Sequence, residues 1–263
     1  MKFMSTAAFL AVASLSIFSV CSQGNSPPSS GCGINGPPSC KNTTIVSNLC
    51  CFEHPGGLLV LTQFWDTDPR TGPENSFTIH GLWPDNCDTT FQENCDPSRE
   101  YTNIAGLLTA QESSDTLVFM QDYWVDINGE NEKAWEHAWA THGTCMSTLK
   151  PSCLPPNSKT GAEAVMYYKT VVKLFQTLPT YTWLANAGIS PSSTETYSLS
   201  TLVSALQHQS GVIPALDCSS GVLNHMRWYF NLKGSVIDGV FIPINAPKDG
   251  SCPSDGIRYV PKA

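Results

Sequence analysis

The stretch Ser76–Pro84 reads SFTIHGLWP and joins a strand-forming run to an ionisable side chain. Its β-branched and aromatic residues predict a short strand, which we expect to break between Gly81 and Pro84 because these residue types interrupt strands. His80 then stands at the end of the strand, beside Gly81 and Trp83. A lone histidine is more often structural than catalytic, so its meaning depends on the other ionisable groups of the chain.

A second histidine-bearing stretch, Lys133–Cys145, reads KAWEHAWATHGTC and has helical potential up to Gly143. His137 and His142 are five residues apart, which places them roughly 140° apart around an ideal α-helix. Zinc-binding pairs on one helix are usually four residues apart, so this spacing argues against a metal site. Together with His80, the two histidines near tryptophans indicate an acid–base pair beside a phosphate-binding or base-stacking surface.

Apolar patterns along the rest of the chain predict both strands and helices. Residues 57–65, GLLVLTQFW, have the length of a buried strand. Apolar residues recur at helical spacing in 160–178 and in 198–211, and both segments end at helix-stopping residues. Residues 226–244 read as a β-hairpin. This mixture, with the late strands adjacent to each other, predicts an α+β fold.

The N-terminal segment MKFMSTAAFLAVASLSIFSVCS places one lysine ahead of a run of apolar and small residues. This pattern predicts a secretory signal peptide over residues 1–22, too short and wrongly flanked for a membrane anchor. The Pro-, Gly- and Ser-rich segment 23–41 is expected to be a loop tied down by its cysteines, and 42–263 to form the main domain. No other apolar run approaches membrane-spanning length, so we expect a secreted, extracellular chain without a membrane partner.

Eleven cysteines fit an oxidising compartment. Cys21 falls within or at the end of the signal, and the ten that remain are an even number, which predicts disulfides without choosing their connectivity. Zinc ligation is the alternative, but no CxxC…CxxC or CxxC…HxxxH pattern occurs. The only N-x-S/T sequon, Asn42-Thr43-Thr44, predicts a glycan on Asn42.

The formal net charge of −8 limits the kind of binding that the chain can perform. Nucleic-acid binders are usually basic, so the charge argues against tight binding of nucleic acid over a large surface. It is compatible with transient engagement of a few nucleotides in a local site. It also suits work at acid pH, where carboxylates are partly neutralised and histidines are charged.

Two segments resemble the signatures of the ribonuclease T2 family: FTIHGLWPDNCD at Phe77–Asp88 and WEHAWATHGTC at Trp135–Cys145. The usual family forms are close to FTIHGLWP and FWEHEWxKHGTC, and the first matches fully. The segment RWYFNLKGSVIDGVFIP, Arg227–Pro243, resembles the closing strands of fungal members. The resemblance covers about Cys32 to Cys252. It implies a secreted, fungal-type T2 fold: one disulfide-rich α+β domain with a central antiparallel sheet packed against helices.

The resemblance assigns a role to each of three histidines. It implies that His80 is the general acid on the leaving 5′-oxygen, that His142 is the general base on the 2′-hydroxyl, and that His137 helps to hold the phosphate. The expected product is a 2′,3′-cyclic phosphate, which water later opens. A pair of imidazoles with pKa values near about 6–7 can supply both proton transfers.

The resemblance also implies the partners and the crosslinks of the chain. Base recognition is expected from Trp83, Asp85 and Phe91, where Phe91 stands in place of the frequent tyrosine. The expected substrate is single-stranded RNA and not DNA, since DNA lacks the 2′-hydroxyl that acts as nucleophile. No metal or other cofactor is required, and we expect a monomer. By similarity with fungal members, the expected disulfides are Cys32–Cys51, Cys40–Cys87, Cys50–Cys153, Cys95–Cys145 and Cys218–Cys252.

The second signature is degenerate in this chain. Ala138 stands where the family has glutamate, Thr141 where it has lysine, and Ala134 where it often has phenylalanine. On an α-helix, positions 138, 141 and 142 share one face, so we expect Ala138 and Thr141 beside His142. Two functions stay open: an attenuated endoribonuclease that retains its proton-transfer pair, and a catalytically inactive T2 scaffold that binds RNA or another partner.

Overall fold

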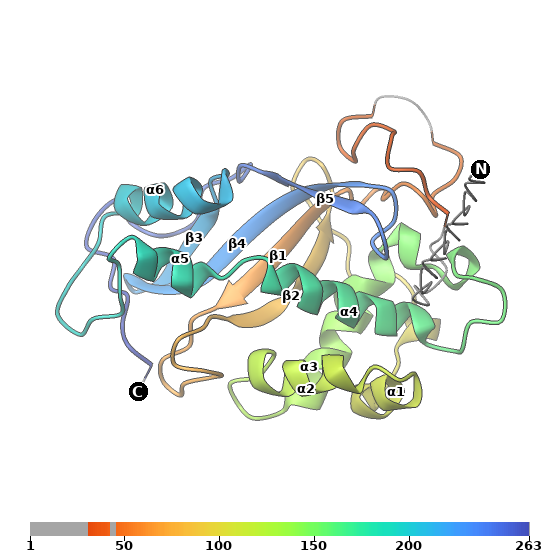
Figure 1. Ribbon diagram of the computed structural model, residues 1–263, viewed down its shortest axis with the longest axis horizontal. Helices are drawn as coiled ribbons and strands as arrows, with labels where there is room; N and C mark the ends of the chain where they lie inside the picture. Colours follow the sequence, from red (N-terminus) through yellow and green to blue (C-terminus); the bar gives the residue numbers. More distant parts are fainter. Residues whose placement is uncertain (1–30, 43–45, 263) are drawn as a thin grey trace, which may run out of the picture.

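A five-stranded antiparallel sheet forms the centre of the computed structural model, which describes residues 31–42 and 46–262 (Figure 1). The strand order is β2-β1-β4-β3, and β5 also pairs with β4. The long strand β4 pairs with β3 over its first half and with β5 over its second half. The strands are β1 (Leu58–Phe64), β2 (Thr78–Asp85), β3 (Ala215–Ser219), β4 (Val222–Lys233) and β5 (Val240–Ile244).

The described residues form six α-helices beside this sheet, and Figure 1 shows α4 and α5 lying across one of its faces. They are α1 (Ile104–Ala110), α2 (Ser114–Tyr123), α3 (Asn131–His137), α4 (Ala162–Gln176), α5 (Thr180–Asn186) and α6 (Leu199–Ser210). Within the described residues, no helix combines the length and apolarity needed to cross a membrane. The α+β fold with a central antiparallel sheet is therefore confirmed.

The predicted strand at 57–65, the predicted helices in 160–178 and 198–211 and the C-terminal hairpin correspond to β1, α4, α6 and β4–β5. The hairpin strands pair from Lys233↔Val240 to Tyr229↔Ile244, so the connection is longer than a tight turn. The predicted signal peptide 1–22, residues 23–30 of the segment after it, and Thr43 and Thr44 of the sequon lie outside the described residues.

The predicted break in the first histidine-bearing strand is wrong. Strand β2 continues through Gly81 and Pro84 to Asp85, and Pro84 pairs with Leu59 of β1. The reason is its place in the sheet, because β2 ends the strand order and has a neighbour on one side only. A proline is tolerated in such an edge strand, where its missing N–H need not serve a second ladder.

All ten cysteines after Cys21 are joined in pairs. The bonds join the same cysteines that the family resemblance implies: Cys32–Cys51, Cys40–Cys87, Cys50–Cys153, Cys95–Cys145 and Cys218–Cys252. Three of the five tie residues 32–51 to one another or to the main domain. The loop segment around 31–42 is thus held to the main domain covalently.

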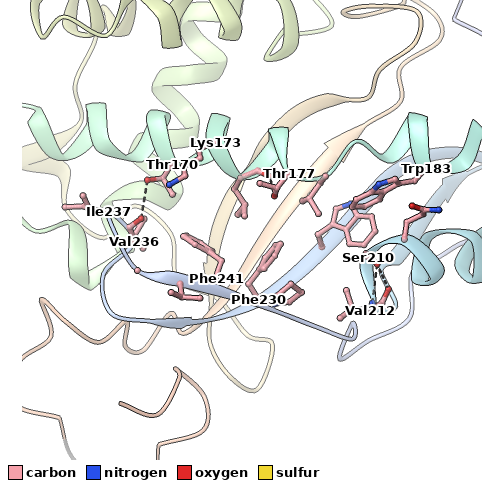
Figure 2. Close-up of a pocket in the computed structure, with 17 residues that line it drawn as sticks. Thr170, Lys173, Thr177, Trp183, Ser210, Val212, Phe230, Val236, Ile237 and Phe241 are labelled. Atoms are coloured by element: carbon pink, nitrogen blue, oxygen red, sulfur yellow. Dashed lines mark hydrogen bonds between the residues drawn. The ribbon is translucent and has the colours of Figure 1, made fainter. Parts of the chain in front are cut away.

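A cavity of about 500 Å³ lies between the sheet and the helices α4, α5 and α6 (Figure 2). Aromatic and aliphatic side chains dominate its lining, among them Trp183, Phe230 and Phe241. Lys173 is the one ionisable residue among the described residues that line it. This cavity offers apolar volume but no pair of groups that could transfer protons.

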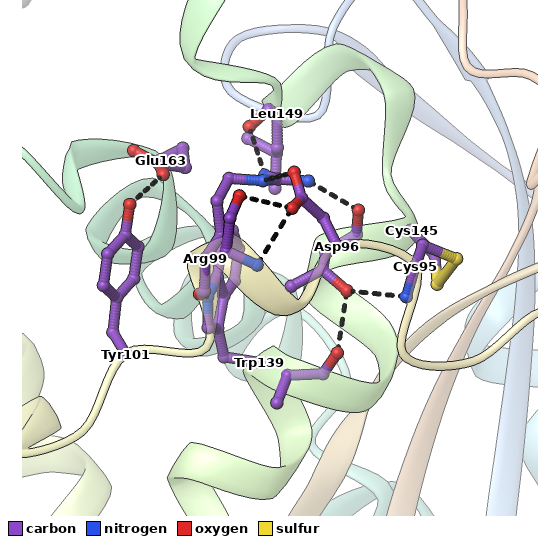
Figure 3. Close-up of polar contacts among 11 residues, drawn as sticks. Cys95, Asp96, Arg99, Tyr101, Trp139, Cys145, Leu149 and Glu163 are labelled. Carbon is purple, nitrogen blue, oxygen red and sulfur yellow. Dashed lines mark hydrogen bonds and ion pairs between the residues drawn. A yellow bond between two sulfur atoms is a disulfide. The ribbon is translucent and has the colours of Figure 1, made fainter.

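The buried guanidinium of Arg99 fixes the end of the second histidine segment and the chain just after it (Figure 3). Its two terminal nitrogens donate to Thr144 O at 2.7 Å and Leu149 O at 3.2 Å. Its Nε lies 2.8 Å from the carboxylate of Asp96. The indole of Trp139 donates from Nε1 to Arg99 O, and the guanidinium carbon lies 5.6 Å from the centre of that ring. One side chain thus joins three segments.

We predict that Arg99→Met lowers the free energy of unfolding by about 3 kcal/mol, because it leaves two buried carbonyls without donors and removes a partly buried ion pair. Urea denaturation of the disulfide-intact protein measures this change. Arg70→Met is the matched control, since Arg70 pairs with Glu74 at an exposed site and should cost under about 0.5 kcal/mol. Equal shifts in the two variants would contradict the role of Arg99.

Candidate functional site

A cavity of about 550 Å³ brings together the histidines of both segments. It lies where the end of β1, the first residues of β2 up to Trp83, the start of β4, and α3 with the turn after it converge. Its lining includes His80, Trp83, His137, Ala138, His142 and His225. The volume falls in the range of small-molecule sites. Among the described residues, no group of three or more His, Cys, Asp or Glu side chains could hold a metal ion.

His80 owes its direction to a β-bulge. Thr62 of β1 pairs with Gly81, whereas the next residue, Gln63, pairs with Ile79, so His80 is an extra residue without a partner on β1. A bulge interrupts the alternation of side chains and re-aims them. On a regular strand, residues three apart face opposite sides. Here the His80 ring lies 4.9 Å from the Trp83 ring, edge to face.

Gln63, opposite the bulge, is itself anchored to the start of α5. Its Nε2 donates to Leu178 O at 3.1 Å, and Thr180 Oγ1 donates to its Oε1 at 2.7 Å. Gln63 is fully buried, and both polar ends of its side chain are satisfied. The β-bulge that directs His80 is therefore stabilised by contacts of Gln63 that lie outside the cavity.

His137 and His142 meet because the chain forms a π-helical turn over Ala138–His142 after α3. Gly143 N–H donates to Ala138 O, five residues earlier, which widens the turn. The two imidazole centres lie 6.0 Å apart, edge to face. The separation of roughly 140° holds for an ideal α-helix and does not apply to this π-helical turn. A Cβ on Gly143 would collide with the Trp139 indole, so the exit from the turn requires glycine.

The two substituted positions do not lie as the helical spacing predicted. Ala138 lines the cavity with His142, but Thr141 is buried outside its lining. Thr141 Oγ1 donates to Asn94 Oδ1 at 3.3 Å and lies 3.2 Å from His137 Nδ1. Since the hydroxyl proton goes to Asn94, the hydroxyl oxygen accepts from His137 Nδ1–H. That tautomer leaves His137 Nε2 available to a ligand.

His80 and His142 both have pKa values below the ordinary value of an imidazole. Burial, followed by the neighbouring His225, lowers the pKa of His80 to about 3. Burial and the neighbouring His137 lower the pKa of His142 to about 4. Within the described residues, no carboxylate is hydrogen-bonded to any of these rings. The cavity therefore disfavours cations until an anion enters it.

Trp83 lies between the acid–base candidates. Its indole stacks on His142 at 4.9 Å and meets the edge of His80 at the same distance. Asp85, at the end of β2, lies outside the cavity lining, and burial raises its pKa to about 6. Phe91 is 62% exposed and also lies outside the lining. The structure thus brings Trp83 to the histidines and leaves Asp85 and Phe91 away from them.

His225 is a histidine of the cavity that no sequence pattern predicted. It stands near the start of β4, just before the run predicted to be a strand, and pairs with Phe64 of β1. The Phe64 ring contacts both His80, at 4.0 Å, and His225, at 4.5 Å. The only signal in the sequence is a histidine next to a β-rich run, which is too weak to place it near His80.

Comparisons with known proteins agree on one family. The sequence model of the Ribonuclease T2 family matches residues 56–239. Ribonuclease Le2 of Lentinula edodes is 59% identical over 236 residues, which are 89% of this chain and 98% of that protein. Ribonuclease Trv of Hypocrea rufa is 50% identical, with coverage of 88% and 98%.

Solved structures give the same result. The crystal structure of Actibind, described as a T2 ribonuclease, superposes with a TM-score of 0.84 at 46% identity and covers 88% of this chain and 98% of that one. Human RNase T2 shares the fold, with a TM-score of 0.58 at 24% identity and coverage of 78% and 99%. On these grounds the chain belongs to the ribonuclease T2 family.

Proposed function

We propose that the chain cleaves single-stranded RNA to a 2′,3′-cyclic phosphate at an attenuated rate, with His80 as general acid and His142 as general base. As a member of its family, the chain is a T2-type endoribonuclease. The observation that carries the finer proposal is the convergence of His80, His137, His142 and Trp83 on one cavity. The sequence places these residues on two segments more than 50 positions apart.

Each proposed step has a group to perform it. His142 takes the proton of the 2′-hydroxyl, the 2′-oxygen forms a bond to phosphorus, and the bond from phosphorus to the 5′-oxygen breaks. His80 gives its proton to that leaving oxygen. His137 Nε2 holds a phosphate oxygen, because its Nδ1 is engaged with Thr141. Water then opens the cyclic phosphate. DNA is not a substrate, since it has no 2′-hydroxyl, and the proton balance needs no cofactor.

The attenuation follows from the side chains at 138 and 141. Ala138 presents a methyl group to the cavity where a glutamate would present a charge, and Thr141 supplies no cation. Loss of one preorganised electrostatic group costs about 10²–10³ in rate. Neither lost group transfers an obligatory proton in the scheme above. The same substitutions favour the second candidate function, an inactive scaffold that binds RNA or another partner.

We place this activity outside the cell, in a monomer. Five disulfides link the described residues, and such bonds persist in oxidising compartments. Residues 1–22 read as a secretory signal, and Asn42 as a glycan acceptor. Base stacking on Trp83, with contributions from Asp85 and Phe91 further along the chain, completes the proposed binding site.

Removal of either proton-transfer group should abolish cleavage. We expect His80→Gln and His142→Gln to lower kcat/KM on single-stranded RNA by at least about 10³-fold, since each variant retains shape but loses a proton transfer. Chromatography of cyclic-phosphate products measures the loss. His208→Gln is the control, because His208 is exposed on α6. An unmodified protein no faster than these variants would favour the inactive scaffold.

Restoring the carboxylate should raise the rate. Ala138→Glu returns an anion beside His142, and we expect kcat/KM to rise by about 10²-fold because the new carboxylate stabilises the imidazolium that forms in the reaction. Ala187→Glu adds the same charge at an exposed position after α5 and should leave the rate unchanged. An inactive parent that becomes active with Ala138→Glu and Thr141→Lys together would identify the scaffold function. A fall in rate in Ala138→Glu would contradict attenuation at this position.

The profile of kcat/KM against pH should lie in the acid range. His80 must carry a proton and has a pKa of about 3, while His142 must be neutral and has a pKa of about 4. The active combination therefore peaks between these values, and above them kcat/KM falls about tenfold per pH unit as His80 deprotonates. Bound substrate phosphate favours the imidazolium, so kcat should peak at higher pH. Initial rates on a dinucleotide from pH 3 to 7.5 test this, and a kcat/KM that rises from pH 4 to 7 would refute it.

A further inference from the structure

His225 stands on the acid side of the cavity. Its ring centre lies 5.8 Å from that of His80, with 29° between the two ring planes, and the Phe64 ring contacts both. It is only partly buried and lines the cavity. Within the described residues, neither of its ring nitrogens has a hydrogen-bond partner. An anion in the cavity could therefore take a hydrogen bond from His225 without breaking an existing one.

The cavity is short of other cations. Its charged lining residues are three carboxylates, Asp66, Asp126 and Glu130, and one ammonium, Lys133. Lys133 Nζ lies 2.5 Å from Glu130 Oε1 in an exposed ion pair, so its charge is already matched. A buried anion needs a partner of opposite charge. In this chain that partner must come from the imidazoles.

We infer that His225 is a fourth functional imidazole of the cavity, which in its protonated form binds the phosphate next to His80. The inference rests on the proposed function, because it takes the RNA phosphate to be the anion of the cavity. It supplies positive charge from β4 in a chain whose second signature has lost its lysine to Thr141. No role in proton transfer is assigned to His225.

The groups around His225 allow it to gain a proton when an anion binds. Asp217 on β3 and Asp66 beyond the end of β1 favour the imidazolium and oppose the lowering of the pKa of His225 by burial. Arg227 on β4 disfavours the imidazolium, but its Nε lies 2.7 Å from Asp217 Oδ2, so part of its charge is matched. His80 on β2 repels a second proton in the empty cavity. A phosphate near both rings would offset that repulsion, because its negative charge favours both imidazolium forms.

The test is a titration of the imidazole Cε1–H resonances by NMR, with inorganic phosphate as the probe and chloride at equal ionic strength as the reference. We expect saturating phosphate to raise the midpoint of His225 by roughly one pH unit, together with that of His80. His208, exposed on α6, should show no shift. A His225 midpoint that is unchanged while His80 and His142 move would overturn the inference.

A variant adds a second measurement. His225→Phe keeps a ring against Phe64 but removes the donor, and we expect it to bind phosphate about tenfold more weakly at pH 5. His208→Phe should bind phosphate as the parent does. Equal affinities in His225→Phe and the parent would overturn the inference.

Phosphate binding and RNA cleavage separate the two proposals. A His225 that responds to phosphate in a protein that cleaves no RNA would support the anion site and refute the proposed activity. RNA cleavage by a protein whose His225 midpoint does not change with phosphate would refute only the role proposed for His225.

Discussion

The buried guanidinium of Arg99 is the interaction on which the shape of the site depends. It holds two carbonyls of the chain after the π-helical turn, Thr144 O and Leu149 O, and is covered by the Trp139 indole from within that turn. The nearby Cys95–Cys145 bond closes the same region covalently. A wide turn is an uncommon backbone state, and packing of this kind maintains it.

The turn matters because it decides which face each side chain takes. A regular α-helix would separate His137 from His142 around its axis and would put position 141 beside 142. The π-turn instead brings the two imidazoles within 6.0 Å and turns Thr141 against His137. Thr141 thus removes the cation that a lysine would supply at this position, and it also forms a hydrogen bond with a histidine of the site.

Electrostatically, the cavity differs from a preformed anion site. His80 and His142 are largely buried in it, and burial is the largest cause of their low pKa values. These two imidazoles are neutral at most pH values and gain a positive charge when an anion binds beside them. Proton uptake is then part of substrate binding, and the affinity for an anion falls as the pH rises.

Local patterns predicted the long elements well. Strand β1 and helices α4 and α6 carry their periodicity within one segment, so the sequence was sufficient for them. The helices α1, α2 and α5 and the strand β3 were not predicted, because they are seven, ten, seven and five residues long and carry weak signals. The break expected in β2 was wrong because edge position is a property of the sheet.

The site, too, could be predicted only in part from the sequence. The two signature segments identified the three histidines and Trp83 through their resemblance to a family, and the structure brings these four together. The π-turn could not be predicted from spacing, since its i+5 bond depends on tertiary packing. His225 could not be found because its nearness to His80 arises from the pairing of β4 with β1.

The bulge at His80 also bears on how such a site can diverge. A side chain aimed by strand register takes its direction from Thr62 and Gln63 on the neighbouring strand, and Gln63 is tied to Leu178 and Thr180 outside the cavity. Its orientation is therefore independent of what stands at position 138. Evolution can exchange the charged residues of the second segment while the acid keeps its place, so loss and recovery of activity need not pass through loss of the fold.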